Sequence, residues 1–230
     1  MDHPAWWVAR GTFGLGLVTL VAFVGGPFLA HFGIVSPMAG FGLFGLGGLL
    51  GIVAALAGVA SALHGGGAGI GLWTGVCVTA VFVILAASGR RYPPINDITT
   101  DMDNPPQFLS ATGLDALPYN RAECAPQQSA AYGDLQPLHR RGTPQSVFQQ
   151  VQAAARRMPG WTIVREDPRL HVLQGVATTR LFRFKDDFVI EVRPQSENSI
   201  VQMRSRSRDG KGDLGANAAR IKAFFDRLKR

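Results

Sequence analysis

The pattern of apolar and charged positions divides the chain into two parts that suit different solvents. Residues 11–89, a block of 79 positions between Arg10 and Arg90, contain no Asp, Glu, Lys or Arg. A water-soluble domain cannot lack ionised side chains over such a length, because its surface must meet water. We therefore expect a membrane region over residues 1–90 and a soluble domain over residues 91–230.

Two weak interruptions, at residues 31–37 and 64–67, divide the apolar block into three segments. The segments cover residues 12–30, 38–63 and 68–88. Each reaches the roughly 20 residues that a helix needs to cross about 30 Å of hydrocarbon. The pattern predicts three transmembrane helices in a lipid bilayer, of which a cleaved signal peptide would explain only the first.

Glycine is concentrated in the apolar block, which holds 20 of the 28 glycines. Gly47 and Gly51 are four positions apart, as are Gly67, Gly71 and Gly75. Small residues at this spacing let helix backbones approach closely. The contact is either an interface of a homo-oligomer or ordinary packing inside one three-helix bundle.

In the soluble part, alternating apolar and polar positions predict β-strands. The expected strands cover residues 161–165, 170–184, 188–193 and 200–208. The pairs Asp186-Asp187 and Glu197-Asn198 are typical of turns between strands. Together these segments form an antiparallel sheet of about four strands.

Two helices are expected beside this sheet. Thr143 is an N-cap candidate before a proline and a run with helical spacing, which ends at Pro159. A last helix is expected over residues 214–228, with Asp213 as its N-cap. The segment before Leu138 is rich in Pro, Gln, Ala and Asn and is expected to be irregular. The fold class is a helical membrane anchor followed by an α+β domain.

Charge is unevenly distributed over the soluble part. Residues 90–139 contain three basic and six acidic side chains, whereas residues 140–230 contain 19 basic and nine acidic side chains. The basic part either meets an anionic partner or pairs with the acidic part of its own domain. Nucleic acid is not expected, because the basic strand lacks interleaved aromatic residues on which bases stack.

The last expected strand places three arginines on one face and continues into a glycine-rich turn. Arg204, Arg206 and Arg208 share that face, and Lys211 lies in the turn before the last helix. Free N–H groups at a helix N-terminus favour anions. This pattern predicts either an anion site at Arg204, Arg208, Lys211 and Asn217 or a capped turn beside a solvated strand.

Acidic residues gather earlier, at Asp97, Asp101 and Asp103. Their spacing does not match a calcium-binding loop, and we expect an Asx turn whose acids pair with arginines of the same domain. No catalytic set and no metal or cofactor site is predicted. The alternative is a hydrolase or transferase that uses these three acids with the arginines.

The chain resembles a family of uncharacterised bacterial proteins, domain of unknown function 1499. The similar segments are Pro94–Asp101, Asn104–Phe108, Gly160-Trp161, Phe184–Asp187, Arg204-Ser205, Ser207-Arg208, Gly210, Asp213–Asn217 and Arg220-Ile221. The resemblance covers residues 95–228. It implies that one constellation unites the first acidic segment with the turn before the last helix. The implied members are Asn96, Asp97, Asp101, Arg204, Arg208, Lys211, Asp213 and Asn217. Arg206 and Asp209 replace residues that are usually apolar in the family.

The two indications of topology disagree. Arg90 and Arg91 lean toward a cytoplasmic soluble domain. Similar membrane-anchored proteins carry arginines at the second interruption, which implies a cytoplasmic loop there and a periplasmic soluble domain. We adopt the second and expect a multi-pass protein of the bacterial inner membrane.

These observations predict a non-catalytic protein of the cell envelope rather than an enzyme. Its soluble domain is expected to bind an anionic ligand, such as a lipid headgroup, or an envelope protein. A component of a membrane transport assembly is a third hypothesis, and the absence of Asp, Glu, Lys and Arg from the apolar block speaks against it.

Overall fold

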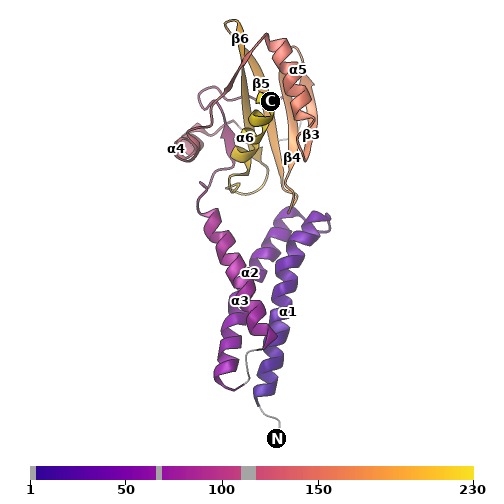
Figure 1. Cartoon of the computed structure of the whole chain (residues 1–230), viewed down its shortest axis with the longest axis vertical. Helices are drawn as coiled ribbons and strands as arrows, with labels where there is room; N and C mark the ends of the chain where they lie inside the picture. Colours follow the sequence, from indigo (N-terminus) through magenta and orange to yellow (C-terminus); the bar gives the residue numbers. More distant parts are fainter. Residues whose placement is uncertain (1–3, 66–68, 110–117) are drawn as a thin grey trace. The chain divides into compact units, whose positions relative to one another are not determined.

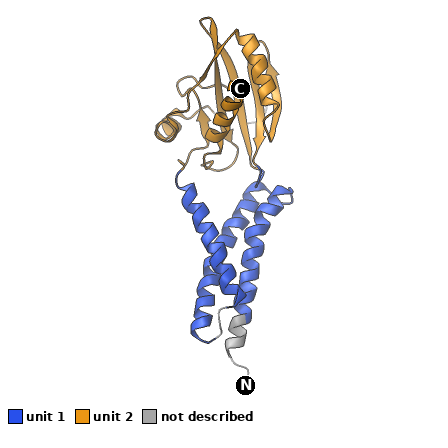
Figure 2. Cartoon of the chain, in the orientation of Figure 1, with its two compact units in different colours: residues 1–91, 180–183 blue, residues 92–179, 184–230 orange. Residues whose placement is uncertain are grey.

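The computed structural model describes residues 4–65, 69–109 and 118–230. Contacts divide the chain into two units, residues 1–91 with 180–183 and residues 92–179 with 184–230 (Figure 2). The secondary structure of both units follows the chain in the order drawn in Figure 1.

The first unit contains three long helices. They are α1 (Pro4–His31), α2 (Pro37–Leu63) and α3 (Ile70–Gly89). Within them the stretches Arg10–His31, Pro37–Leu63 and Ile70–Gly89 are long and apolar enough to cross a membrane. Ser36 caps α2, because its Oγ accepts the N–H of Ala39, and Pro37 occupies the first turn. The three predicted spans are thereby confirmed as candidate membrane-spanning helices.

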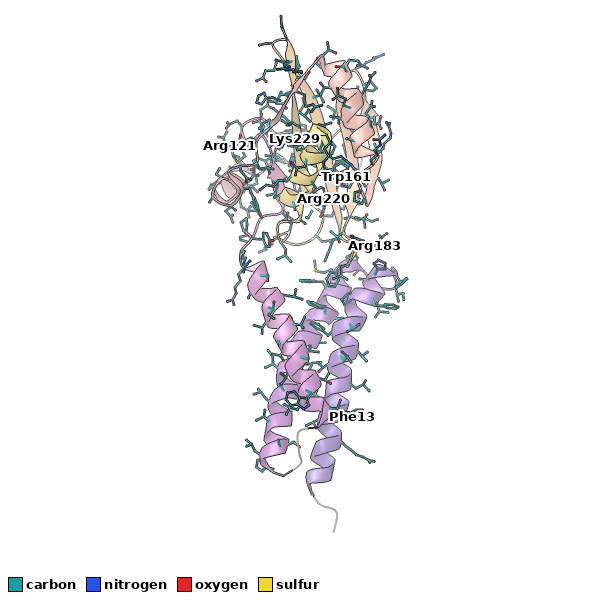
Figure 3. All side chains as sticks on the ribbon, in the orientation of Figure 1. Phe13, Arg121, Trp161, Arg183, Arg220 and Lys229 are labelled. Atoms are coloured by element: carbon teal, nitrogen blue, oxygen red, sulfur yellow. The ribbon has the colours of Figure 1, made fainter. Side chains whose placement is uncertain are left out.

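Large apolar side chains cover the outside of these helices, as Figure 3 shows around Phe13. Phe13, Val21, Leu56 and Ile84 each expose more than half of their surface. So extensive an apolar surface is unsuited to water and fits contact with lipid.

Glycines lie where the helices of this bundle touch. A Cβ on Gly71 would lie 2.2 Å from the carbonyl oxygen of Thr12, and one on Gly75 would lie 2.5 Å from the amide nitrogen of Ala55. These two α3 glycines therefore serve close packing against α1 and α2 of the same chain.

The second unit is an α+β domain built on a six-stranded antiparallel sheet. Its strands are β1 (Asp97–Thr99), β2 (Leu138–Arg141), β3 (Trp161–Asp167), β4 (Val172–Thr178), β5 (Lys185–Gln195) and β6 (Asn198–Ser207). Its helices are α4 (Arg121–Tyr132), α5 (Pro144–Ala155) and α6 (Ala216–Lys229). The strand order is β1-β6-β5-β4-β3, and β2 pairs with the other half of β6. The predicted fold class is confirmed. Among the described residues of this unit, the sheet has six strands instead of about four, and three helices are present instead of two.

One face of the sheet packs against α5 and α6 to form the core (Figure 1). Trp161 of β3 lies against Phe188 of β5, with ring centroids 4.0 Å apart, and against Phe224 of α6 at 5.3 Å. Phe188 and Phe224 are fully buried. Thr143 caps α5 as predicted, since its Oγ1 accepts the N–H of Ser146.

The segment before Leu138 is not irregular throughout, because it contains α4. This helix has no broad apolar face and buries only Cys124 and Gln128. It is attached through Gln128, whose Nε2 donates to the carbonyl of Thr99 at 2.6 Å and whose Oε1 accepts the Thr99 N–H at 3.1 Å. A side-chain amide thus satisfies the outer backbone edge of β1, as another strand would.

Three further expectations are corrected. Asp186 and Asp187 do not form a turn: they lie in β5 and are buried. The last helix begins at Ala216 instead of residue 214, because Gly215 before it is left-handed, with φ 79°. Its N-cap is therefore Gly215 and not Asp213. His171, expected in a strand, lies in the turn between β3 and β4 with φ 52°.

Candidate functional site: a layered arginine and carboxylate network with a small cavity

The centre of the network is an ion pair between neighbouring strands. Arg204 of β6 donates from Nε to Oδ1 of Asp97 at 2.9 Å and from a terminal nitrogen to Oδ2 at 2.7 Å. Arg204 is completely buried and Asp97 is 3% exposed. The register pairs Asp97 with Arg206 and Thr99 with Arg204, so the ion pair is diagonal on one face of the sheet. Two hydrogen bonds to one carboxylate fix both side chains.

Aromatic rings complete the surroundings of Arg204. Its guanidinium carbon lies 5.1 Å from the ring centroid of Phe108 and 5.6 Å from that of Tyr119. Both distances fall within cation–π range. A cation with this environment is an internal structural element, and no open face of it remains for a large ligand.

A second pair lies on the same face. Arg208 donates to both oxygens of Asp187, at 2.8 and 2.7 Å, and the Asp187 side chain is completely buried. The hydrogen bonds from Arg208 to Asp187 raise the pKa of Arg208 above its ordinary value. Arg206 lies between the two pairs in sequence and approaches Oδ2 of Asp97 to 3.7 Å.

The opposite face of β6 carries a separate polar layer. Ser205 donates to Oδ1 of Asn217 at 2.7 Å, and the Asn217 amide donates to Ser207 at 3.0 Å. Arg220, labelled in Figure 3, forms an ion pair with Asp186 and also donates to Ser205 at 2.9 Å. The C-terminal half of β6 is therefore held between two layers of charged and polar side chains.

The turn after β6 is bound to the start of the domain. Asn96 donates to the carbonyl of Gly210 at 2.6 Å, and Asn217 donates to the carbonyl of Asn96 at 3.1 Å. Asp213 accepts the N–H groups of Gly215 and Asn217, at 2.8 and 2.9 Å. Burial raises the pKa of Asp213 above its ordinary value.

Of the residues predicted from the sequence, most lie in or beside this network. Those that the structure brings together are Asn96, Asp97, Arg204, Arg208, Lys211, Asp213 and Asn217. Asp101 lies elsewhere: its Oδ2 accepts from Gln202 at 3.0 Å and lies 3.6 Å from Arg193. Oδ1 of Asp101 accepts the N–H groups of Asp103 and Asn104, which is the expected Asx turn. Asp103 forms an ion pair with Arg121.

The three acids of the hydrolase alternative therefore do not share one site. Asp97 meets Arg204, Asp101 meets Gln202 and Asp103 meets Arg121. Over residues 4–65, 69–109 and 118–230, no group of three or more His, Cys, Asp or Glu side chains is arranged to hold a metal ion.

Sequence reasoning missed Asp186, Asp187, Gln128 and Arg220. A signal for the two acids was present, because alternation continues through them: Asp186, Phe188 and Ile190 share one face. Two adjacent acids are also a common signal for a turn, and the two patterns conflict here. Gln128 had no local signal, since its role depends on the edge of a distant strand.

A cavity of about 120 Å³ opens beside the first face of the network. Its lining residues come from β1 and the two residues before it, from β6, from the start of α4 and the segment just before it, and from the turn after β6. They are Ile95, Asn96, Asp97, Pro118, Asn120, Glu123, Cys124, Arg206 and Lys211. Both carboxylates already have partners, since Asp97 accepts from Arg204 and Glu123 accepts from Asn120 at 2.8 Å. Arg206 and Lys211 supply positive charge, and the N-terminus of α4 adds a partial positive charge.

These features define an α+β domain whose strand arginines are held by its own carboxylates, following three helices long enough to cross a membrane. The chain belongs to the family described as protein of unknown function, DUF1499, which matches residues 97–228, more than half of the 230 residues. The resemblance seen in the sequence is thereby confirmed. No curated protein matches the chain.

Proposed function

We propose that the protein is a non-catalytic, membrane-anchored module that holds a small anionic group in the cavity beside Lys211. The group is a phosphate or carboxylate, supplied by a lipid headgroup or by another component of the cell envelope. One observation carries the proposal: Arg206, Lys211 and the N-terminus of α4 converge on a cavity whose two carboxylates already have partners.

The cavity suits one small anionic group. Its volume of about 120 Å³ has room for a phosphate or carboxylate but not for a sugar chain or a peptide. Lys211 is exposed and its flexible side chain can follow a ligand, whereas Asn96 is fixed by its bond to Gly210. An anion there gains the helix dipole and two cationic side chains.

The predicted anion residues then divide into two roles. Lys211 contacts the ligand together with Arg206. Arg204, Arg208 and Asn217 position β6 and the turn, because their polar atoms bond to Asp97, Asp187 and the backbone of Asn96.

We further propose that the soluble domain is periplasmic and that the helices lie in the bacterial inner membrane. Three spans place the two ends of the membrane region on opposite sides. Similar anchored proteins imply a cytoplasmic loop after α2, which supports this side.

The test of sidedness uses a Glu197→Cys variant in a Cys77→Ser background, since Glu197 lies exposed in the β5–β6 turn. A membrane-impermeant thiol reagent is expected to label this cysteine in intact spheroplasts. Labelling only after lysis would place the domain in the cytoplasm.

The test of binding is native mass spectrometry of the full-length protein purified in mild detergent. A phosphate- or carboxylate-bearing molecule is expected on the wild type and on a Lys222→Gln control, which alters an exposed lysine paired with Asp134. It is expected to be absent from an Arg206→Gln/Lys211→Gln variant. An adduct that survives in that variant, or no adduct in any form, would overturn the proposal.

A further inference from the structure

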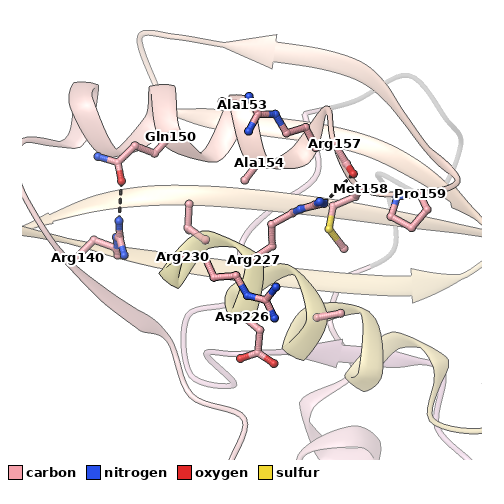
Figure 4. Close-up of a pocket in the computed structure, with 12 residues that line it drawn as sticks. Arg140, Gln150, Ala153, Ala154, Arg157, Met158, Pro159, Asp226, Arg227 and Arg230 are labelled. Atoms are coloured by element: carbon pink, nitrogen blue, oxygen red, sulfur yellow. Dashed lines mark hydrogen bonds between the residues drawn. The ribbon is translucent and has the colours of Figure 1, made fainter.

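A larger groove lies on the opposite part of the domain, between α5 and α6 (Figure 4). Its volume is about 890 Å³. Its lining residues come from β2, both helices and the segment that follows α5. They are Arg140, Gln150, Ala153, Ala154, Arg157, Met158, Pro159, Ala223, Asp226, Arg227, Leu228 and Arg230.

The rim of the groove is strongly basic. Arg140, Arg157, Arg227 and Arg230 line it. Arg140 donates to Gln150 at 2.7 Å and Arg227 donates to the carbonyl of Arg157 at 3.0 Å, which are neutral acceptors (Figure 4). Within the part of the chain that the structure describes, no carboxylate forms an ion pair with these four arginines.

Asp226 is the one carboxylate among the lining residues described, and Lys229 approaches it to 3.5 Å. The groove therefore differs from the β6 network, where each strand arginine has a carboxylate beside it. Guanidinium groups gathered without counter-charges repel one another, and an acidic partner relieves that repulsion.

Between these arginines the groove is lined by apolar and mostly small side chains. Ala153, Ala154 and Ala223 are small, so they leave room for the backbone of a docked helix to come close to α5 and α6. Met158 adapts its shape to different neighbours. An apolar floor with a cationic rim matches an amphipathic helix that carries acids along its edges.

We propose that the α5–α6 groove docks an acidic amphipathic helix of another protein. A second copy of this chain is a poor occupant, because residues 140–230 alone carry 19 basic against nine acidic side chains. A nucleic acid finds no aromatic ring among the groove residues on which to stack. The inference is independent of the anion proposal, since the two sites share no residue.

The experiment uses the full-length protein in nanodiscs of phosphatidylcholine, a lipid without net charge. The probe is a fluorescent helical peptide with Glu along both edges of a Leu and Ala face, beside a peptide with Gln at every Glu. The groove variant is Arg157→Glu/Arg227→Glu. The control, Arg169→Glu/Lys185→Glu, makes the same change in charge at exposed residues outside the groove.

The Glu peptide is expected to bind the wild type and the control alike and to bind the groove variant at least about tenfold more weakly. The Gln peptide is expected to bind the wild type weakly. Added salt is expected to weaken binding of the Glu peptide to the wild type. Hydrogen exchange of the complex is expected to protect α5 and α6.

Three results would overturn the proposal. They are no binding of the Glu peptide, equal loss in the groove variant and the control, and protection elsewhere in the domain. A fourth contrary result would come from measuring how the wild type and the groove variant bind vesicles with and without phosphatidylglycerol. If the groove variant loses attraction to anionic vesicles while peptide binding is unchanged, the groove faces a lipid surface instead.

Discussion

Arg204 and Asp97, which are 107 positions apart, form a two-hydrogen-bond ion pair that is sealed from solvent between β6 and β1. This pair connects the first strand of the domain to the last. Beside it, Asp187 holds Arg208, and on the other face Asp186 holds Arg220. Three ion pairs thus connect the strands and the last helix of this domain from inside.

The first prediction concerns the removal of one partner of this pair. Asp97→Asn and Arg204→Met each leave a buried group without its counter-charge, and each is expected to cost about 3–5 kcal/mol of unfolding free energy. Pulse proteolysis of the full-length protein in detergent, over a urea series, measures this cost. The Asp97→Asn/Arg204→Met double variant is expected to lose less unfolding free energy than the sum of the two single variants. Additive losses would contradict direct coupling.

A second prediction tests the attachment of α4. Gln128→Ala leaves the N–H and carbonyl of Thr99 without their partner, and we expect a loss of about 1–3 kcal/mol. The amide of Thr99 is expected to exchange faster with solvent deuterium. Gln127→Ala removes the neighbouring amide, which bonds only within its own helix, and is the matched control. Equal effects of the two variants would refute the role of Gln128.

The reactivity of Cys124 gives a third prediction. Burial raises the pKa of Cys124 to about 11, so very little thiolate is present at pH 8. In a Cys77→Ser background, iodoacetamide is expected to modify Cys124 only as fast as the domain opens. Its rate is expected to increase with urea in parallel with unfolding. Rapid modification of the native protein would show that the thiol is accessible.

The fourth prediction follows from Asp213. Because its folded pKa is raised, this group favours the folded state below its unfolded pKa of about 3.9 and loses that contribution as the pH rises. The unfolding free energy of wild type relative to Asp213→Asn is therefore expected to fall as the pH rises from about 4 through the folded pKa. A difference that grows with pH would contradict the assigned direction.

Packing of the helical bundle gives a fifth prediction. Gly71→Ala places a methyl group 2.2 Å from the Thr12 carbonyl, so α1 and α3 must separate. The unfolding free energy of the full-length protein, measured by titration with sodium dodecyl sulfate, is expected to fall by about 1–3 kcal/mol. Gly14→Ala meets nothing within 4 Å and is the control. A large effect of Gly14→Ala would instead indicate a partner on that face.

The features that sequence alone predicted are local ones. The charge-free block gives three spans without any knowledge of packing, and the Thr143-Pro144 pair gives the start of α5. Asp186 and Asp187 were misassigned because their partners, Arg220 and Arg208, are more than 20 positions away. The helix α4 was missed because one buried amide, not an apolar face, attaches it to the sheet.

The candidate site also has a part that local sequence patterns predict and a part that depends on distant contacts. The strand arginines and the turn lysine follow from alternation and from a glycine-rich helix start. Which arginine pairs with Asp97 depends on the register of β1 and β6. The register places Arg206 opposite Asp97 and Arg204 opposite Thr99, and Asp97 forms its two hydrogen bonds with the diagonal neighbour, Arg204. The sequence contains the residues, and only the pairing of β1 with β6 decides their roles.

The most direct test of the central claim is the effect of inorganic phosphate on the melting temperature of the full-length protein. Phosphate is expected to raise the melting temperature of the wild type and of a Lys222→Ala control, because a ligand that binds only the folded state stabilises it. Lys211→Ala, at an exposed turn residue, is expected to melt like the wild type without phosphate and to show no rise with it. An equal rise in Lys211→Ala and wild type would show that the cavity is not the anion site.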